Sequence, residues 1–497
     1  MLKSAPVLSE QLGDIQGMLK SGYGWLKTSR FWLLTIRDGR EDQARAWIKE
    51  LLNADLIVTA KRVEQAKKKA TDDDLAISEA LAIAFSHAGL MKLGCEDAPA
   101  HPFPTPFCSG MGSELREKLL NDGPREWRWS DVEGGLDRQP VHILVAQWSL
   151  RDTTTKMPVP DPNVFQVNVV ENDPCSFKKL PGDPKERLRE PFGFRDGIAQ
   201  PVIPGLRDVD SEIDTAAMRH ADRLDDDRVV SPGEFVLGYR NEYDELTYCP
   251  DVKRWAESYP GSRFTLNGSY LAVRQIEQYV DRFAELEKKY GESICEKLMG
   301  RKRNGLPLSW KGPPNAQITD AEADAFRYQI DDANGFMCPK GSHIRRMNPR
   351  DSLGSDVKSG ITASKLHRLL RRGRPYLEET ADKNKPRQGI FFIACNADFE
   401  RQFEFIHQRW MRNFRFGALH HEDDPIVGKP TSKQSSKTFT VPALPSGSEV
   451  SLKDLTETLG GGYFFLPGLK ALKFIASHAA RPVVRAAGSP AEVAGAR

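Results

Sequence analysis

The sequence predicts an α+β protein built from two units that each combine a sheet with helices. Its 497 residues exceed the length at which single hydrophobic cores stop growing, so two domains are expected. Hydrophobic residues make up 39% of the chain and charged residues 28%, which is typical of a soluble globular protein. Apolar runs of strand type alternate with helical segments in both halves, and this repeated order favours the α+β class.

The first half contains short strand candidates and two helical segments. Residues 31–37 form an apolar run of strand type, and residues 41–53 follow with apolar side chains at helical spacing. Residues 74–93 predict a second helix. After a proline-rich loop, residues 141–148 and 164–170 are further strand candidates. This half therefore provides enough strands for one sheet with helices beside it.

The second half repeats this order of elements. Its expected strands are residues 267–277, 389–395 and 463–466, and its expected helices are residues 276–290, 398–411 and 469–475. The stretch 208–227 is acidic without a clear period, which predicts a solvated insertion. Residues 422–449 are rich in Pro, Ser, Thr and Lys and predict a long surface loop.

Charge and cysteine usage exclude several classes of protein. Lys and Arg total 71 and Asp and Glu total 69, so a net charge of +2 creates no overall attraction to nucleic acid or to an anionic membrane. The 7 cysteines form no C-x-x-C pair, which argues against a disulfide framework or a zinc ribbon. No apolar leader, twin-arginine leader or membrane-spanning run is visible, so a cytoplasmic location is expected.

A histidine among arginines is the first candidate site. His343 lies in a run that also contains Arg345, Arg346 and Arg350. One imidazole beside several guanidiniums suits a metal that carries anionic groups. Haem fits this description, because a histidine can hold its iron while arginines pair with its propionates. An ordinary surface or capping histidine is the commoner role of such a residue.

Two further stretches carry residues that suit chemistry at such a site. Residues 191–201 place Asp196 between glycines that permit tight turns, so its carboxylate can be presented over a pocket. The alternative is an ordinary Asp-Gly turn. A basic run over residues 367–376 is usually explained as a nucleic-acid patch or a solvated face. Its arginines are Arg368, Arg371, Arg372 and Arg374.

Taken together, these stretches resemble the haem-site motifs of the dye-decolourising peroxidases. Gly193-Phe-Arg-Asp-Gly197, the run around His343 and Leu370-Arg371-Arg372-Gly373 occur in the family's order, with further agreement over residues 12–475. The resemblance, to the larger bacterial and fungal forms, implies two ferredoxin-like domains of the dimeric α+β barrel type, with antiparallel sheets and peripheral helices. The distal Asp loop would belong to residues 1–235, and the haem ligand and distal Arg to residues 236–497.

The resemblance also implies a role for each matching residue. His343 is similar to the proximal iron ligand of haem b, and Asp196 and Arg371 are similar to the distal pair. Arg345 is similarly placed to an arginine that faces a haem propionate. In another branch of the family an Asn stands where this chain has Gly373.

The implied activity is a haem peroxidase. Hydrogen peroxide would be cleaved heterolytically, and bulky organic reductants such as dyes and phenolics would be oxidised. Heterolysis needs a group that moves a proton between the peroxide oxygens and a fixed cation that stabilises the developing charge. Asp196 and Arg371 can supply these two roles, and with Asp196 as the relay we expect an optimum below pH ~5, near the ordinary pKa of Asp.

The surroundings of the haem can also be assigned to candidate residues. A ligating histidine normally donates its second N–H to an acid or carbonyl, and Glu400 is the preferred partner of His343, with Glu404 and Asp398 left open. Aromatic residues in this region can form apolar walls or ordinary core. The candidates for the walls are Phe391 and Phe403.

Some alternatives remain open from the residues alone. His407 is a conceivable but less favoured ligand. His420 and His421 precede three acids and could form a loop site for a divalent cation, although solvated side chains are the commoner outcome. A haem-handling protein, either a carrier or one that releases iron, would need the ligand but not the distal pair. A nucleic-acid-binding protein using residues 301–311 and 367–374 would show steep salt dependence. The physiological reductant and the oligomeric state stay open.

Overall fold

The computed structural model describes residues 6–477, except for 70–76, 121, 124–125, 135–138, 151–153, 173–188, 207–226, 315, 317, 381, 383–384, 430–436 and 443–448. The expected acidic insertion at 208–227 lies outside the described residues apart from Asp227. Among the helices within these ranges, none combines the length and the apolar character that crossing a bilayer requires.

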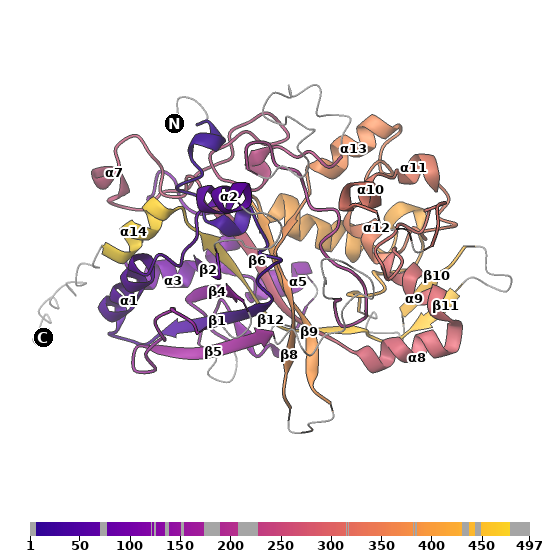
Figure 1. The fold of residues 1–497 in the computed structure, drawn as a ribbon, viewed down its shortest axis with the longest axis horizontal. Helices are drawn as coiled ribbons and strands as arrows, with labels where there is room; N and C mark the ends of the chain where they lie inside the picture. The colour runs from indigo at the N-terminus through magenta and orange to yellow at the C-terminus, as the bar shows by residue number, and fades with distance from the viewer. Residues whose placement is uncertain are drawn as a thin grey trace, which may run out of the picture.

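A 10-stranded sheet runs through the molecule in the order β5-β1-β4-β2-β12-β6-β9-β7, with β3 beside β12 and β8 beside β9 (Figure 1). Its first-half strands are β1 (Thr28–Ile36), β2 (Glu79–Phe85), β3 (Trp129–Ser130), β4 (Ile143–Ser149) and β5 (Phe165–Asn172). Its second-half strands are β6 (Ser269–Gln278), β7 (Leu370–Arg371), β8 (Arg374–Glu378), β9 (Arg387–Asn396) and β12 (Thr456–Leu466). A separate pair consists of β10 (Lys437–Thr440) and β11 (Glu449–Leu452).

Each half of the chain contributes strands in the same spatial order. If β1, β2, β4 and β5 are counted as first to fourth, the sheet order β5-β1-β4-β2 is fourth, first, third, second. The same count over β6, β7, β9 and β12 gives the same order for β12-β6-β9-β7. These strand pairs are antiparallel. The expected α+β class with two ferredoxin-like units and antiparallel sheets is therefore confirmed.

The two units meet where β12 lies beside β2. Their ladder contact pairs Phe465 with Phe85, and α14 packs against α1. Because strands of both halves share one sheet, the proposed division between residues 235 and 236 stays a prediction. Figure 1 shows α1, α3 and α14 at one end of the molecule, whereas α8 to α13 lie at the other.

The helices surround this sheet. The α-helices are α1 (Glu41–Asn53), α2 (Ala60–Lys69), α3 (His87–Lys92), α4 (Thr105–Ser109), α5 (Glu114–Leu120), α7 (Trp255–Ser258), α8 (Val280–Tyr290), α9 (Glu292–Met299), α10 (Asp320–Asp324), α11 (Tyr328–Asp331), α12 (His343–Met347), α13 (Val357–Lys365) and α14 (Leu469–Ser477). Shorter 3₁₀ turns are η1 (Leu8–Glu10), η2 (Gly17–Leu19), η5 (Pro232–Glu234) and η8 (Phe416–Ala418), and π-helical turns are η6 (Glu400–Glu404) and η7 (Ile406–Met411).

Two sequence-based expectations about elements were wrong. Residues 74–93 were expected to be one helix, but β2 and α3 occupy that stretch. The reason is that β2 is buried along its whole length, so it lacks the alternation of polar and apolar residues that marks a half-exposed strand. The expected loop over 422–449 contains β10, which pairs with β11 across part of that stretch.

The sheet has a separate apolar core on each face, and this division positions the site. Side chains of a strand point alternately to opposite faces. Along β9, Phe391, Ile393 and Cys395 join the core that also contains Phe31. The intervening residue Phe392 points to the other face, where it lines a cavity.

Candidate functional site

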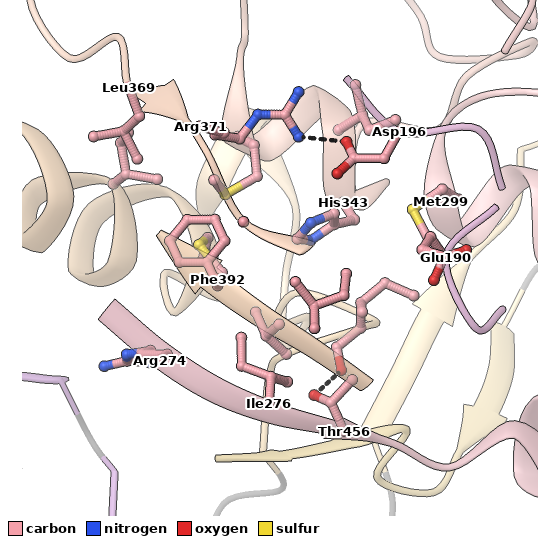
Figure 2. Close-up of a pocket in the computed structure, with 18 of the residues that line it drawn as sticks. Glu190, Asp196, Arg274, Ile276, Met299, His343, Leu369, Arg371, Phe392 and Thr456 are labelled. Carbon is pink, nitrogen blue, oxygen red and sulfur yellow. Dashed lines mark hydrogen bonds and ion pairs between the residues drawn. The ribbon is translucent and has the colours of Figure 1, made fainter. Parts of the chain in front are cut away.

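A cavity of about 240 Å³ lies between the second half of the sheet, α12 and the loop that carries Asp196. All three predicted motifs reach it, because His343, Asp196 and Arg371 belong to its lining (Figure 2). Apolar side chains form much of the remaining wall. They include Ile276, Met299, Ile344, Leu369, Phe392 and Ile426.

His343 begins α12 and is held by a buried carboxylate. Its Nδ1 lies 2.9 Å from Oδ2 and 3.1 Å from Oδ1 of Asp424. Burial alone would raise the pKa of Asp424, but the facing imidazole and backbone hydrogen bonds lower it to about 2. The ionised carboxylate accepts a hydrogen bond from the Nδ1–H group. In this tautomer the lone pair of Nε2 is available to a metal.

The predicted acid partner of His343 is wrong. Glu400 has a side chain 64% exposed and pairs with Arg116 at 3.6 Å. Glu404 accepts hydrogen bonds from Tyr463 Oη at 2.7 Å and from Arg116 Nη1 at 2.8 Å. Asp398, the third candidate, accepts the backbone N–H of Arg401. Glu400 and Glu404 thus face α5 and β12, and Asp398 is engaged by Arg401, so Asp424 takes the role that the sequence assigned to Glu400.

The alternative cation site on the loop at 420–424 is not favoured, because the acids of this loop are engaged elsewhere. Asp424 turns toward His343, and Glu422 accepts the backbone N–H of Thr440. Asp423 pairs with Arg412 at 3.6 Å. Asp424 follows His343 by 81 positions, so no local motif joined the two residues.

The structure brings the predicted distal pair together above His343 (Figure 2). Arg371 Nη1 donates to Asp196 Oδ1 at 3.0 Å, and Nη2 donates to the carbonyl of Ile198 at 3.0 Å. Gly193 and Gly197 have φ of +94° and +88°, a backbone region that glycine enters without strain. One guanidinium therefore holds both the side chain and the backbone of the Asp196 loop.

The strand pairing of β7 with β9 positions Arg371. Its ladder partner is Ala394, and two residues further along the chain runs closely over β9 at Gly373. A Cβ at Gly373 would lie 2.6 Å from the carbonyl oxygen of Phe391. This crowding explains why position 373 is glycine.

The basic run at 367–376 is not a nucleic-acid patch. Arg368 and Arg372 are buried and donate to backbone carbonyls, Arg372 to those of Met18 and Leu19. Arg374 donates to the carbonyls of Gly22 and Tyr23 at 2.7 Å. Arg372 and Arg374 therefore stabilise the packing of the N-terminal segment. Together with the buried Arg368, they present no basic face to solvent.

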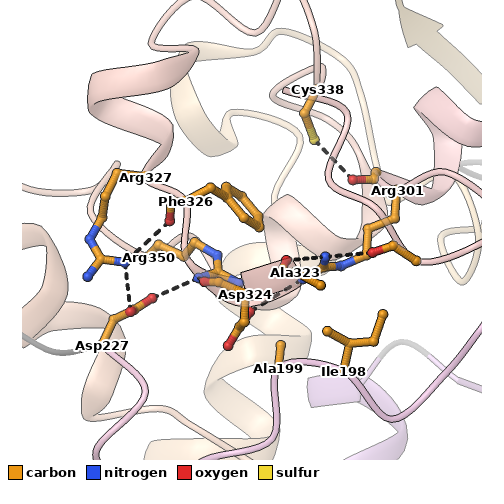
Figure 3. Close-up of polar contacts among 12 residues, drawn as sticks. Ile198, Ala199, Asp227, Arg301, Ala323, Asp324, Phe326, Arg327, Cys338 and Arg350 are labelled. Carbon is orange, nitrogen blue, oxygen red and sulfur yellow. Dashed lines mark hydrogen bonds and ion pairs between the residues drawn. The ribbon is translucent and has the colours of Figure 1, made fainter. Parts of the chain in front are cut away.

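A buried ionic network lies beside the loop that carries Asp196, near Ile198 and Ala199 (Figure 3). Asp324 accepts hydrogen bonds from Arg350 and from Arg301, and Asp227 accepts from Arg350 at 2.9 Å and from Arg327 at 2.7 Å. Such paired and hydrogen-bonded charges are rigid because separating one partner leaves a buried charge without compensation.

Arg368 connects this network to the distal loop. Its Nη1 donates to the carbonyl of Asp227 at 2.9 Å, and its Nη2 donates to the carbonyl of Ala199 at 3.0 Å. The network thus fixes the backbone three residues after Asp196.

Arg345 does not reach the cavity, so its predicted role at a propionate is wrong. Its side chain is buried against the ring of Tyr328, and Nη1 donates to the carbonyls of Asp332 and Cys338. The side chain on α12 points away from the face that carries His343. The arginines that line the cavity are Arg195, Arg274, Arg301, Arg368 and Arg371.

Of the two predicted aromatic walls, the structure places one at the cavity. Phe403 belongs to the lining. Phe391 is fully buried on the other face of the sheet, where its ring stacks on Phe31 at 4.1 Å. Phe392 takes its place, since one step along a strand reverses the direction of the side chain.

Two polar groups at the cavity were missed by the sequence analysis. Glu190 is buried, and it accepts the N–H groups of Phe192 and Phe194 and an amide N–H of Gln278. Burial is the main cause that raises the pKa of Glu190 to about 7. Its only sequence signal is its position directly before the glycine-containing motif at residues 191–201.

The second polar group is the guanidinium of Arg274 on β6, which also lines the cavity. Arg274 pairs with Asp122 at 2.5 Å, and its Nη1 lies 3.1 Å from Nε2 of His407. Burial lowers the pKa of His407 to about 3. Nε2 of His407 is thus engaged by a guanidinium, whereas the ring nitrogen of His343 that faces away from Asp424 is left for a metal.

Comparisons with known proteins agree on one family. Residues 251–421 match the model of the C-terminal region of Dyp-type peroxidases. The chain is 25% identical to dye-decolorizing peroxidase msp1 of Mycetinis scorodonius, over 94% of this chain and 88% of that protein. It is 26% identical to a dye-decolorizing peroxidase of Exidia glandulosa, over 94% and 87% of the two chains.

Solved structures of the same family share the fold. A DyP-type peroxidase of Anabaena sp. superposes with a TM-score of 0.71 at 22% identity, covering 95% of this chain and 98% of that one. The fungal DyP-type peroxidase of Auricularia auricula-judae gives a TM-score of 0.70 at 21% identity, covering 94% and 99%. A dye-decolorizing peroxidase in complex with 2,6-dimethoxyphenol gives 0.67 at 21% identity, covering 94% and 99%.

Proposed function

We propose that this chain is a DyP-type peroxidase that binds haem b and uses hydrogen peroxide to oxidise bulky organic reductants such as dyes and phenolics. The observation that carries the proposal is the joint position of His343, Asp196 and Arg371 on one cavity. A haem-handling protein would need only the histidine. Relatives are named dye-decolorizing peroxidases, and one similar structure contains a phenol.

The donor set of the cavity fits haem. His343 offers one imidazole nitrogen whose tautomer is fixed by an ionised carboxylate, as a ligand of haem iron requires. Apolar side chains suit the faces of a porphyrin, and the lining also contains arginines, the side chains that pair most readily with carboxylates such as propionates. When bound, haem supplies the redox-active iron at which peroxide is reduced.

The proximal residues of this chain keep the ligand in one state. The Asp424 carboxylate accepts a hydrogen bond from the Nδ1–H group of His343 and so fixes the orientation of the ring. The backbone N–H groups of Ile426 and Val427 donate to the same carboxylate at 2.9 Å, so the acid is itself fixed. This arrangement makes the imidazole more basic.

The distal residues handle the proton and the charge of peroxide. We assign to the Asp196 carboxylate the transfer of a proton from one peroxide oxygen to the other. The Arg371 guanidinium, 3.0 Å from Asp196, supplies the fixed positive charge that stabilises the departing oxygen. Arg371 also donates to the Ile198 carbonyl, so the positions of Asp196 and Arg371 relative to each other are fixed by two hydrogen bonds.

An optical titration tests the proposal. The unmodified chain supplemented with haem is expected to show a Soret band at one haem per chain, whereas His343→Ala loses or strongly alters that band. Asp196→Asn should retain the band but lose oxidation of 2,6-dimethoxyphenol by hydrogen peroxide.

Two results would contradict the proposal. Stoichiometric haem with an unchanged spectrum in His343→Ala would refute the ligand assignment. Full turnover in Asp196→Asn would refute the proton transfer, and a haem-bound wild type without turnover would favour the haem-handling alternative.

A further inference from the structure

A cluster of three different metal-binding side chains lies outside the peroxidase cavity. His87 Nε2 is 3.1 Å from Asp97 Oδ1, and Cys108 Sγ is 3.8 Å from Asp97 Oδ2. Their ligand atoms all lie within 4.8 Å of one another. None of these residues belongs to the lining of the cavity that holds His343.

The three side chains are held by separate elements of the first half. His87 begins α3, whose N-terminus is capped by Ser86, and Cys108 lies on α4. Asp97 lies on a loop that forms a backbone bridge with Val252. The ring of His87 also meets the ring of Phe107 edge-on, with centroids 5.6 Å apart. The ligand atoms are therefore positioned by packed backbone before any ion binds.

We propose that His87, Asp97 and Cys108 form a binding site for a divalent transition-metal ion of borderline softness, with Zn²⁺ as the ion whose chemistry matches best. Nitrogen, oxygen and sulfur donors together suit Zn²⁺, whereas Ca²⁺, Mg²⁺ and Mn²⁺ prefer oxygen alone. Usual zinc–ligand bond lengths place tetrahedral donors roughly 3.4–3.6 Å apart. The distance of 3.1 Å between His87 Nε2 and Asp97 Oδ1 lies just below this range, and the distance of 3.8 Å between Cys108 Sγ and Asp97 Oδ2 lies just above it.

A cysteine nucleophile is the competing explanation of the same cluster, and the geometry argues against it. The thiol of Cys108 faces the carboxylate of Asp97, and the imidazole of His87 is hydrogen-bonded to the same carboxylate instead of to the thiol. A bound cation supplies the positive charge that a thiolate at this place needs.

The site has an open position. The side chains of His87 and Asp97 are 20% and 26% exposed, and Cys108 is exposed. Three protein ligands leave the fourth position of a tetrahedral ion to water or to a small ligand. An ion here would tie α3, α4 and the Asp97 loop together and would stabilise the folded state by mass action.

Alkylation of Cys108 tests the proposal without any substitution. The haem-loaded full chain is treated with EDTA, dialysed and exposed to iodoacetamide with or without ZnCl₂, and each cysteine is followed by peptide mapping. Zn²⁺ is expected to slow modification of Cys108 at least tenfold, and EDTA should restore the rate. Equal rates with and without Zn²⁺ would overturn the proposal.

Variants then identify the ligands. Calorimetric titration with ZnCl₂ should show one equivalent of tightly bound ion, with affinity reduced at least tenfold in Cys108→Ser, Asp97→Asn and His87→Asn. His101→Asn is the matched control, because His101 lies on the same loop but its ring contacts Tyr248 instead. Zinc binding that is unchanged in the three ligand variants would place the ion elsewhere and overturn the assignment. Retained Soret absorbance and peroxidase rate show that each variant is folded.

Discussion

On each side of the cavity a carboxylate is held by a nitrogen donor, but the surroundings of the two carboxylates are opposite. On the His343 side the Asp424 side chain is 0% exposed, whereas on the other side the side chains of Asp196 and Arg371 are 51% and 32% exposed. Burial protects the first pair from water, and its carboxylate is held by two further backbone N–H groups. Water reaches the second pair, so Asp196 can exchange protons with solvent.

This difference separates orientation from turnover. A buried and fully hydrogen-bonded carboxylate keeps one charge state and one geometry, which suits the support of a ligand. A half-exposed acid beside a guanidinium suits a proton that must move during each cycle. We therefore expect substitutions on the proximal side to change haem binding and its spectrum, and substitutions on the distal side to change turnover.

The largest effect is expected on the distal side. Asp196→Asn removes the proton acceptor, and Arg371→Leu removes the fixed charge, so each should lower kcat/KM for hydrogen peroxide by about 10²–10³-fold. The Soret band should persist because the contacts of His343 are untouched. Stopped-flow kinetics with peroxide and an optical spectrum of the same samples measure both properties.

A matched control exists for the distal acid. Asp398 in the second half of the chain has a similarly exposed carboxylate beside an arginine. Its side chain is 45% exposed, and Oδ2 lies 3.9 Å from Nε of Arg401. Asp398→Asn is expected to keep the wild-type rate. A similar loss of rate in Asp398→Asn would show that general loss of charge, and not the position of Asp196, controls turnover.

A smaller effect is expected from the proximal acid. Asp424→Asn leaves Nδ1 of His343 without its carboxylate, and removal of such a supporting partner typically costs about 10–100-fold in metal affinity or activity. Glu400→Gln should have no comparable effect because Glu400 pairs with Arg116 at the surface. Haem dissociation rates, measured by transfer to an excess of apomyoglobin, compare the two variants. Faster release in Glu400→Gln than in Asp424→Asn would reverse the assignment of the proximal acid.

The sequence located the parts of the site that short segments carry. His343, Asp196 and Arg371 each lie in a motif of a few residues, and glycines with positive φ shape the Asp196 loop. Asp424 could not be found in this way, because only the fold brings it to a histidine 81 positions earlier. Phe391 was chosen one position away from Phe392, and in a strand that single step moves a side chain to the opposite core.

The same limit applies to charged side chains and to spacing. Arg345 follows His343 by two positions, and on a helix two positions place side chains on different faces, so it turns into a buried contact with Tyr328. The residues His87, Asp97 and Cys108 follow no metal-binding spacing, and three elements must pack before they meet. The α+β class, by contrast, followed from the repeated succession of elements, whereas the strand order did not, and β2 was predicted to be helical.

The smallest expected effect concerns the pH dependence of the two sides. Glu190 supports the Asp196 loop through the N–H groups of Phe192 and Phe194, and its pKa is raised from 4.5 to about 7. Between these values the folded chain binds more protons at this position than the unfolded chain, so this contribution to the free energy of unfolding falls as the pH rises. Asp424, with a pKa lowered to about 2, stays ionised over the same range, and its contribution is lost only in stronger acid.

Glu190→Gln removes the titration at this position and tests the difference. The free energy of unfolding of this variant, relative to the unmodified chain, should rise by roughly 2–3 kcal/mol between pH 5 and pH 8, since one unit of pKa corresponds to about 1.4 kcal/mol. Any hydrogen bond that the amide cannot make adds an offset that does not depend on pH. Urea denaturation at pH 5, 6, 7 and 8 measures the two curves. Parallel curves would show that the pKa of Glu190 is not raised in the folded chain.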